Sequence, residues 1–299
     1  MTHGQRYSLP LNRIKVKAHT NWCDDVTLRE HLNRCCPQGD YIWKDIELTL
    51  SHRYDFFVIF NFPRHPFFDP QKTIVLNAET KTTRDHIKKK AYTLFGFDPG
   101  KNYFFVFDTN QYHSVDKWFH SRTYADIAKS DFSKNKTKLM SGIVSGNNAL
   151  LGHKLRLNMV RELNNLEGYD HFGRGDFSQM KHYLGPLENK EEGIIPYKYH
   201  FNCENDFEQG YFTEKFLDAL FFESLIFYDG CTNMNDFFDP ESYVKIDITQ
   251  PAASFDIIQK SIKDKLWEQR LPAIKRAKDR ALNDYNPMEI IWEIIHGKI

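Results

Sequence analysis

Residues 197–205 read YKYHFNCEN, and residues 211–222 read YFTEKFLDALFF. The aromatic and apolar side chains of the first segment alternate at every second position, which is typical of a β-strand. The apolar side chains of the second segment recur at spacings of three and four, which predicts a helix that starts near Thr213 and Glu214. A polar segment at 206–210 joins them. Strand, loop and helix in this order form the unit from which α/β domains are built.

The start of the expected helix carries polar groups that suit a sugar nucleotide. A helix N-terminus attracts anions. Lys215 brings an ammonium group for phosphate charge, Glu214 a carboxylate for hydroxyl groups, and Asn205 a carboxamide for either. The alternative is structural, because neighbouring Glu and Lys side chains also form surface charge pairs and Asn often caps a turn.

The totals describe a globular protein of two ordinary domains. The chain has 299 residues, of which 41% are hydrophobic and 27% charged, and its formal net charge is zero. Nothing in this balance favours nucleic acid or an anionic membrane as a partner. The five Cys show no ligand or disulfide spacing, the first ten residues lack an apolar signal core, and no window is long enough to span a bilayer. We therefore expect free thiols and a cytoplasmic location.

Predicted strands alternate with predicted helices in both halves of the chain. Strands are expected at 14–18, 42–50, 55–60, 73–76, 103–107, 139–144, 169–172, 197–203, 225–228 and 243–246. Helices are expected from Asp25 or Thr27 to Leu32, and at 83–94, 155–163, 213–222, 255–263 and 265–282, the last with a kink or break at Pro272. This alternation predicts two α/β domains with mostly parallel sheets.

The polar stretch at 130–138 is the expected linker between the two domains. We accordingly expect an N-terminal domain at 1–134 and a C-terminal domain at 139–282. A final helix at 283–299, capped by Asn286 and Pro287, is expected to pack back on the N-terminal domain.

Two further residues are placed where catalytic groups lie in α/β proteins. Arg156 falls on a helix after a strand and turn of the second domain, at the rim where ligands bind. Glu79 follows a buried strand of the first domain, where partial burial would raise its pKa and make it a general base. The simpler interpretations are a surface arginine and a loop carboxylate.

Other kinds of site have no support in the sequence. The thirteen His show no paired ligand spacing, and no D-x-D motif is present, so Arg and Lys rather than a metal are expected to neutralise a diphosphate. Gly173-Arg174-Gly175 is too short for a dinucleotide fingerprint, and neither a P-loop nor a G-x-S-x-G motif occurs.

The residues that carry a family likeness are concentrated between 139 and 247. They are Val144-Ser145, Arg156, Leu163-Asn164, Tyr197-Lys198-Tyr199, Cys203-Glu204-Asn205, Phe212-Thr213-Glu214-Lys215, 226–230 and 236–244. This pattern resembles glycosyltransferase family 10, the α1,3/4-fucosyltransferases, in which a Tyr-Lys-Phe strand ends in Phe-Glu-Asn and a loop leads to Tyr-Val-Thr-Glu-Lys.

The resemblance implies a GT-B architecture, two Rossmann-like domains with the active site between them. It implies that the second domain binds GDP-fucose. Arg156 and Lys215 would meet the pyrophosphate, Glu214 would hold ribose or sugar hydroxyls, and Asn205 would bind phosphate or sugar. Asn77-Ala78-Glu79 falls where the family has the segment of its proposed catalytic base, so Glu79 would deprotonate the acceptor.

The implied reaction is an inverting single displacement onto a hydroxyl of a glycan acceptor, with an α1,3-type linkage. His19, Trp22, His65 and Tyr112 are candidate acceptor-lining residues in the first domain. Two alternatives stay open, namely the same fold with another nucleotide sugar and an inactive glycan-binding module.

Some residues depart from the family pattern near the expected donor pocket. Cys203 replaces the usual Phe, Asp229 stands in place of a Trp, and Gly146 lengthens the turn after Ser145. These departures leave the identity of the sugar open. The absence of an anchor like that of the animal enzymes makes a soluble bacterial or viral form the better match.

Overall fold

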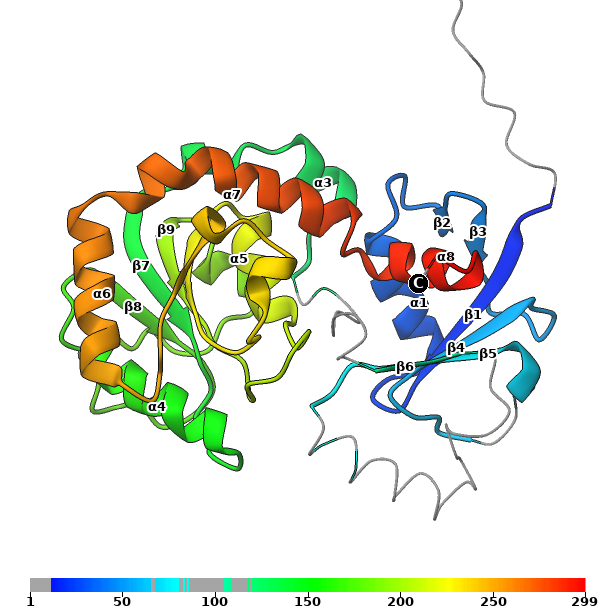
Figure 1. Ribbon diagram of the computed structural model, residues 1–299, viewed down its shortest axis with the longest axis horizontal. Coiled ribbons are helices and arrows are strands. Elements are labelled where there is room, and N and C mark those ends of the chain that lie inside the picture. The colour runs from blue at the N-terminus through cyan, green and yellow to red at the C-terminus, as the bar shows by residue number, and fades with distance from the viewer. Residues whose placement is uncertain are drawn as a thin grey trace, which may run out of the picture.

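Two α/β bodies lie side by side, each built around its own sheet (Figure 1). The computed structural model describes residues 12–65, 68–80, 83, 85, 105–108, 118 and 120–298. Within these residues the element order alternates strands and helices in both halves, and most strand pairs are parallel. The predicted α/β class with mostly parallel sheets is therefore confirmed.

The N-terminal sheet has the strand order β2-β3-β1-β4-β5-β6. Only the pairing of β2 with β3 is antiparallel among the described strands. The bounds are β1 Ile14–Thr20, β2 Ile42–Trp43, β3 Ile46–Leu48, β4 Phe56–Phe60, β5 Thr73–Asn77 and β6 Phe105–Asp108. Because β1, β4 and β5 run in the same direction, the loops that follow them leave the sheet at one edge.

Two predictions in this domain need correction. The alternating stretch 42–50 is not one strand, because Lys44 adopts a left-handed φ of 54° and turns the chain back between β2 and β3. Helix α1 (Asp25–Arg34) is capped by Asp24, whose side chain accepts a hydrogen bond from the backbone N of Thr27, one residue before the earlier of the two predicted caps. Most of the helix predicted at 83–94 lies outside the described residues.

The C-terminal sheet has the order β11-β10-β9-β7-β8, and all its strand pairs are parallel. Its strands are β7 Lys138–Ile143, β8 Tyr169–Phe172, β9 Tyr197–Phe201, β10 Leu225–Tyr228 and β11 Tyr243–Lys245. The alternation in β9 suggested one buried face, but His200 and Phe201 are both fully buried. The reason is the central position of β9, with neighbours on both sides and helices over both faces.

Helices α4 (Leu151–Leu163) and α5 (Glu214–Phe221) follow β7 and β9, and α6 (Pro251–Lys263) and α7 (Leu266–Asn283) close the domain. Helix α4 packs against α6, and α5 packs against α7. Helix α4 begins four residues earlier than predicted, so Arg156 lies in its second turn. Helix α7 continues past Pro272, so the predicted break does not occur.

Helix α8 (Pro287–Ile295) returns to the N-terminal body at the end of α7 (Figure 1). Asn286 caps it as predicted, accepting a hydrogen bond from the backbone N of Met288. Trp43 Nε1 donates to Glu289 Oε2 at 2.7 Å. Trp292 Nε1 donates to Asp45 Oδ1, also at 2.7 Å. These bonds attach the end of the chain to the β2–β3 hairpin.

The polar stretch at 130–138 is packed rather than extended. After α3 (Tyr124–Lys129) it forms a 3₁₀ turn at Phe132–Asn135 and then enters β7. Lys136 Nζ donates to Ser224 Oγ at 2.8 Å, and burial lowers the pKa of Lys136 to about 7. The first crossing between the domains is therefore anchored on the C-terminal body.

Candidate active site

A cavity of about 510 Å³ lies at the carboxyl ends of the C-terminal strands. In parallel α/β sheets this edge is where ligands bind, because the loops that follow the strands and the starts of the helices converge there. The cavity is lined by the end of β7, by residues that follow β7, β8 and β9, and by the first two turns of α4 and the first turn of α5: Ile143, Ser145, His153, Arg156, Gly173, Arg174, Pro186, Leu187, Glu188, Lys190, Asn202, Asn205, Glu214 and Lys215. All four predicted donor-site residues are in this set.

Arg156 is a nearly buried cation in the wall of this cavity, with 5% of its surface exposed. Its Nη1 donates to the backbone O of Cys203 at 3.1 Å, and its Nε has no hydrogen-bond partner among the described residues. Burial lowers the pKa of Arg156, and the nearby Glu204 and Glu214 carboxylates offset part of that effect. A guanidinium keeps its charge under such conditions, so it is ready to receive an anion.

Lys215 is the second cation, at the N-terminus of α5. Its Nζ lies 3.3 Å from Glu204 Oε2 and 3.4 Å from Glu214 Oε1. Burial by itself would lower the pKa of Lys215, but the charges of Glu204 and Glu214 outweigh it and hold the pKa above its usual value. The ammonium group is therefore charged at neutral pH.

Glu204 is a structural part of this site that the sequence reasoning did not single out. It is fully buried and accepts hydrogen bonds from the backbone N and the hydroxyl of Thr213, at 2.9 and 3.0 Å. Thr213 in turn caps α5 by accepting from the backbone N of Lys215. Glu204 thus fixes both the start of α5 and the lysine that follows. The available signal in the sequence was the position of Glu204 inside the Cys203-Glu204-Asn205 motif.

Close backbone contacts hold the two helices of the site in place. A side chain at Gly152 would put its Cβ 2.2 Å from the backbone O of Asn205, so α4 can approach the loop after β9 only because this residue is glycine. Gly230, with φ of 151°, similarly leaves room for Glu204, whose Cβ would lie 2.6 Å from an added Cβ. The carboxamide oxygens of Asn202 and Asn205 are buried without hydrogen-bond partners among the described residues.

The cavity carries an excess of positive charge. Its cationic side chains are Arg156, Arg174, Lys190 and Lys215, against the carboxylates of Glu188 and Glu214. Four further residues of this cavity were not predicted to be site residues: Arg174, Lys190, His153 and Asn202. Arg174 belongs to the Gly173-Arg174-Gly175 loop, which is too short for a dinucleotide fingerprint but follows β8 directly. The charge excess and the orphaned amide oxygens fit an anionic ligand with hydroxyl or amino groups.

Glu79 faces this domain from the carboxyl edge of the N-terminal sheet. It follows β5 and is half-buried. The loop that carries it is held by Asn61, whose Oδ1 accepts from the backbone N of Ala78 at 2.9 Å. Burial raises the pKa of Tyr211, and the charges of Glu204 and Glu79 raise it further. Glu79 therefore lies within electrostatic reach of Tyr211, two residues before the cap of α5.

The predicted acceptor-lining residues do not form one group. His19 is fully buried, its Nδ1 bonds to Asp25 Oδ1 at 2.6 Å and its Nε2 accepts from the backbone N of Arg64 at 3.0 Å. Since His19 has no free surface, lining a pocket is the wrong role for it, and it supports the ring of His65 at a centroid distance of 4.6 Å. Trp22 lines a separate cavity described below. Tyr112 lies outside the described residues.

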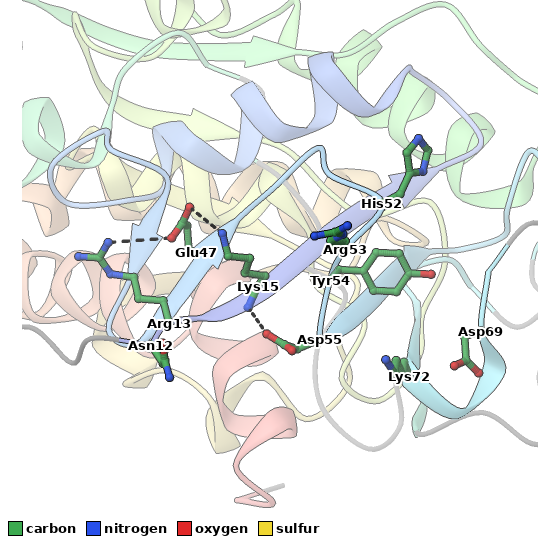
Figure 2. Close-up of a pocket in the computed structure, with 10 residues that line it drawn as sticks. All are labelled: Asn12, Arg13, Lys15, Glu47, His52, Arg53, Tyr54, Asp55, Asp69 and Lys72. Carbon is green, nitrogen blue, oxygen red and sulfur yellow. Dashed lines mark hydrogen bonds and ion pairs between the residues drawn. The ribbon is translucent and has the colours of Figure 1, made fainter.

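A larger cavity, of about 940 Å³, lies at the edge of the N-terminal sheet opposite to the one that carries Glu79. Figure 2 shows that Glu47 lies between Arg13 and Lys15, with Asp55 on the other side of Lys15. Lys72 precedes β5, and Asp55 precedes β4. This cavity is therefore at the amino ends of the strands, away from the edge where parallel sheets bind ligands, and no C-terminal residue lines it.

Among the described residues, no group of three or more His, Cys, Asp or Glu side chains is arranged to hold a metal ion. None of the helices in the described part of the chain has the length and apolar character needed to cross a membrane.

Two domains on mostly parallel sheets, with a cavity rich in cationic side chains at the carboxyl edge of one, match the GT-B architecture of glycosyltransferases. Residues 133–264 match the family model described as glycosyltransferase family 10 (fucosyltransferase), C-terminal domain. The resemblance drawn from the sequence is therefore confirmed for this segment of the chain.

Solved structures agree with this architecture. The chain is similar to an alpha1,3-fucosyltransferase solved with GDP-fucose, at 18% identity and a TM-score of 0.51, over 90% of this chain and 84% of that one. The same coverage holds for an alpha1,3-fucosyltransferase solved with GDP, at 16% identity and a TM-score of 0.50. At this identity the likeness establishes the shared fold. No curated protein sequence matches the chain significantly.

Proposed function

We propose that the protein is an inverting fucosyltransferase that moves fucose from GDP-fucose to a hydroxyl group of a glycan acceptor, with an α1,3-type linkage. The observation that carries this proposal is the pair of cations, buried Arg156 and partly buried Lys215, in one cavity of the segment that matches the family 10 model. The GDP and GDP-fucose named for the similar fucosyltransferase structures support the choice of donor.

The donor half of the site needs two charges at the diphosphate. Arg156 is the residue we assign to one phosphate, because its Nε–H has no partner among the described residues. Lys215 is assigned to the other, because its raised pKa keeps it charged. Glu214 and Asn205 are assigned to hydroxyl groups of ribose or fucose. With these cations present, the transfer is proposed to proceed without a metal ion.

The chemical step is a single displacement. Glu79 accepts the proton of the acceptor hydroxyl, and that oxygen forms a bond to the anomeric carbon of fucose. The bond from this carbon to the β-phosphate oxygen breaks, and its electron pair leaves with GDP. Attack from the face opposite the leaving group converts the β-linked donor into an α-linked product. Arg156 and Lys215 stabilise the charge that grows on the departing diphosphate, which is the usual location of the largest catalytic effect.

A nucleotide sugar other than GDP-fucose is the alternative donor, and one observation favours it. Asp229 stands where the family pattern has Trp. Its carboxylate accepts two hydrogen bonds, from the backbone N of Ile248 to Oδ2 and from the backbone N of Gly230 to Oδ1, both at 3.0 Å. A half-buried carboxylate at the end of β10 changes the shape and polarity behind Glu204. A nucleotide sugar other than GDP-fucose is therefore the second candidate.

A donor screen separates these proposals. Thermal unfolding is followed with GDP, UDP and their sugars, and turnover is then measured by release of GDP from GDP-fucose with and without a mixed glycan acceptor pool. We expect GDP and GDP-fucose to raise the melting temperature most. Stabilisation by UDP alone favours the second candidate. Donor binding without any release of GDP points to an inactive glycan-binding module.

A further inference from the structure

A third cavity, of about 460 Å³, lies where the two domains meet and is called the interdomain cavity below. Three groups of residues line it: Trp22, His31 and Arg34 from the loop after β1 and from α1; Trp118, His120 and Ser121 from the first crossing segment; and Glu188, Asn189, Lys190 and Glu191 from the C-terminal domain. Glu188 and Lys190 also line the first cavity, so the two cavities adjoin.

The inner wall of this cavity is a pair of rings set in place by the C-terminal domain. Trp118 and His120 stack with centroids 5.4 Å apart at 29°. Phe221 packs edge-on against Trp118, and Phe222 packs edge-on against His120. The two inner rings are 1% and 2% exposed, so their positions are fixed by packing rather than by solvent.

Three nitrogen atoms of these rings are buried without a hydrogen-bond partner among the described residues. They are Trp118 Nε1 and both ring nitrogens of His120. The nearest carboxylate oxygen to His120, Asp218 Oδ1, is 3.9 Å from Nε2, and the other oxygen of Asp218 is bonded to Lys190 Nζ at 2.5 Å. Buried polar atoms are almost always bonded. A polar group that enters the cavity is therefore the expected partner.

The protonation state of His120 defines what that polar group must be. Burial and the charge of Lys190 lower the pKa of His120 to about 3. At neutral pH its imidazole therefore offers one donor and one acceptor, and the indole of Trp118 offers one donor. A hydroxyl group both donates and accepts, so a ligand with several hydroxyl groups satisfies all three atoms.

The charge of the interdomain cavity differs from that of the cavity that contains Arg156 and Lys215. Arg34 and Lys190 are matched by the carboxylates of Glu188 and Glu191. Arg34 Nη2 donates to the backbone O of Trp118 at 3.3 Å, and Glu191 Oε2 accepts from the backbone N of Ser121 at 3.3 Å. The charges that line this cavity are therefore equal in number, which favours a neutral ligand over an anion.

We propose that this interdomain cavity binds a neutral sugar ring of the acceptor, with His120 and Trp118 as its hydrogen-bonding residues and Trp22 at its outer side. The assignment rests on the proposed function, because an acceptor must lie next to the donor, and the shared residues Glu188 and Lys190 place the two ligands side by side. Aromatic rings suit a sugar because its C–H faces are apolar while its edges carry hydroxyl groups.

The test compares His120→Phe with wild type, using the full chain with and without GDP. Phenylalanine keeps the stacking against Trp118 and removes both ring nitrogens. Galactose, glucose, mannose and N-acetylglucosamine are titrated separately by saturation-transfer difference NMR, and N-acetylneuraminic acid is titrated as a charged sugar. We expect at least one neutral sugar to bind and its affinity to fall at least tenfold in His120→Phe, with the Kd for GDP within twofold of wild type.

Two controls make the result specific. His52→Phe changes an exposed histidine in the cavity of Figure 2 and should leave sugar affinity as it is. Trp22→Ala changes a half-exposed residue at the outer side of the cavity and should also weaken sugar binding, which keeps the test valid if His120→Phe does not fold.

The outcomes separate this inference from the proposed function. The acceptor assignment is overturned if wild type binds none of the four neutral sugars, or if it binds N-acetylneuraminic acid instead. It is also overturned if both cavity variants, His120→Phe and Trp22→Ala, retain the sugar affinity of wild type. A chain that loses sugar binding in His120→Phe but binds no GDP overturns the donor assignment and keeps the cavity.

Discussion

Glu204 Oε2 lies 3.3 Å from Lys215 Nζ, and the glutamate is fully buried. Glu204→Gln removes this charge and weakens the charge-assisted hydrogen bonds from Thr213, which contribute about 1.5–3 kcal/mol, while Lys215 keeps Glu214 at 3.4 Å. We therefore expect Glu204→Gln to lower the free energy of unfolding by roughly that amount and to lower the pKa of Lys215. Urea denaturation at pH 7 measures the first effect.

Glu241→Gln is the matched control, because Glu241 is exposed on a short 3₁₀ turn of the same domain. Its free energy of unfolding should stay within about 0.5 kcal/mol of wild type. Equal stability of Glu204→Gln and Glu241→Gln would show that the pair does not hold the start of α5.

Lys215→Ala tests the donor site directly. It removes a partly buried charge assigned to the diphosphate, and charge-assisted hydrogen bonds of this kind contribute about 1.5–3 kcal/mol. GDP affinity measured by calorimetry should therefore fall by about ten- to a hundredfold. Lys245→Ala, which changes an exposed lysine on β11, should bind GDP as wild type does. Unchanged GDP affinity in Lys215→Ala would remove this lysine from the donor site.

Glu79→Gln tests the proposed base. Glutamine keeps the size of the side chain but cannot accept the acceptor proton as a carboxylate does. Turnover should fall by about 10²–10⁴-fold, which is the usual contribution of a general base, while the Kd for GDP stays near that of wild type. Glu47→Gln, in the cavity of Figure 2, is the control. Turnover close to wild type in Glu79→Gln would assign the base to another group.

The sequence was most informative where local rules coincide with tertiary position. The start of α5 at Glu214, the cap at Asn286 and the strand Leu225–Tyr228 were all predicted, because capping chemistry and apolar runs act over a few residues. The gathering of Arg156, Asn205, Glu214 and Lys215 in one cavity was anticipated from the family resemblance, to which the order of strands and helices added the position of Arg156 at the rim of the domain.

The sequence could not give the properties that depend on distant neighbours. His19 was predicted to line the acceptor site, yet it is fully buried and bonded to the backbone of Arg64 and the side chain of Asp25. His120 carried no pattern at all, because its environment comes from Phe221, Phe222 and Lys190, which are separated from it by many residues. Burial of this kind depends on the assembled fold rather than on local periodicity.

Gly152→Ala tests the contact that positions Arg156. The added Cβ would lie 2.2 Å from the backbone O of Asn205, a distance that neither backbone can accommodate without moving. We expect the start of α4 to shift away from the loop after β9, with a loss of at least tenfold in GDP affinity. Leu151→Ala, at a residue that is 68% exposed in the same turn, is the control. GDP affinity equal to wild type in Gly152→Ala would mean that α4 can move without disturbing the donor site.

The last prediction concerns acid stability and rests on His200 in the central strand β9. Its Nδ1 is within 2.9 Å of Ser141 Oγ, and burial, with the charges of Lys190 and Lys136, lowers its pKa to about 3. Below about pH 6.5 the unfolded chain binds a proton at this residue and the folded chain does not, so the free energy of unfolding falls as the pH falls. Neutral His200 therefore lowers the stability of the fold only in acid: the free energy of unfolding is unaffected above about pH 6.5 and decreases progressively from about pH 6.5 to about pH 3.

His200→Gln keeps a hydrogen-bonding side chain of similar size and removes the titration. Between pH 6.5 and 4 the free energy of unfolding of wild type should fall more steeply than that of the variant, by up to about 1.4 kcal/mol per pH unit. Denaturant titrations at half-unit intervals measure the two slopes. Parallel slopes would show that the imidazole gains its proton in the folded state as readily as in the unfolded chain, so that burial in β9 does not keep it neutral.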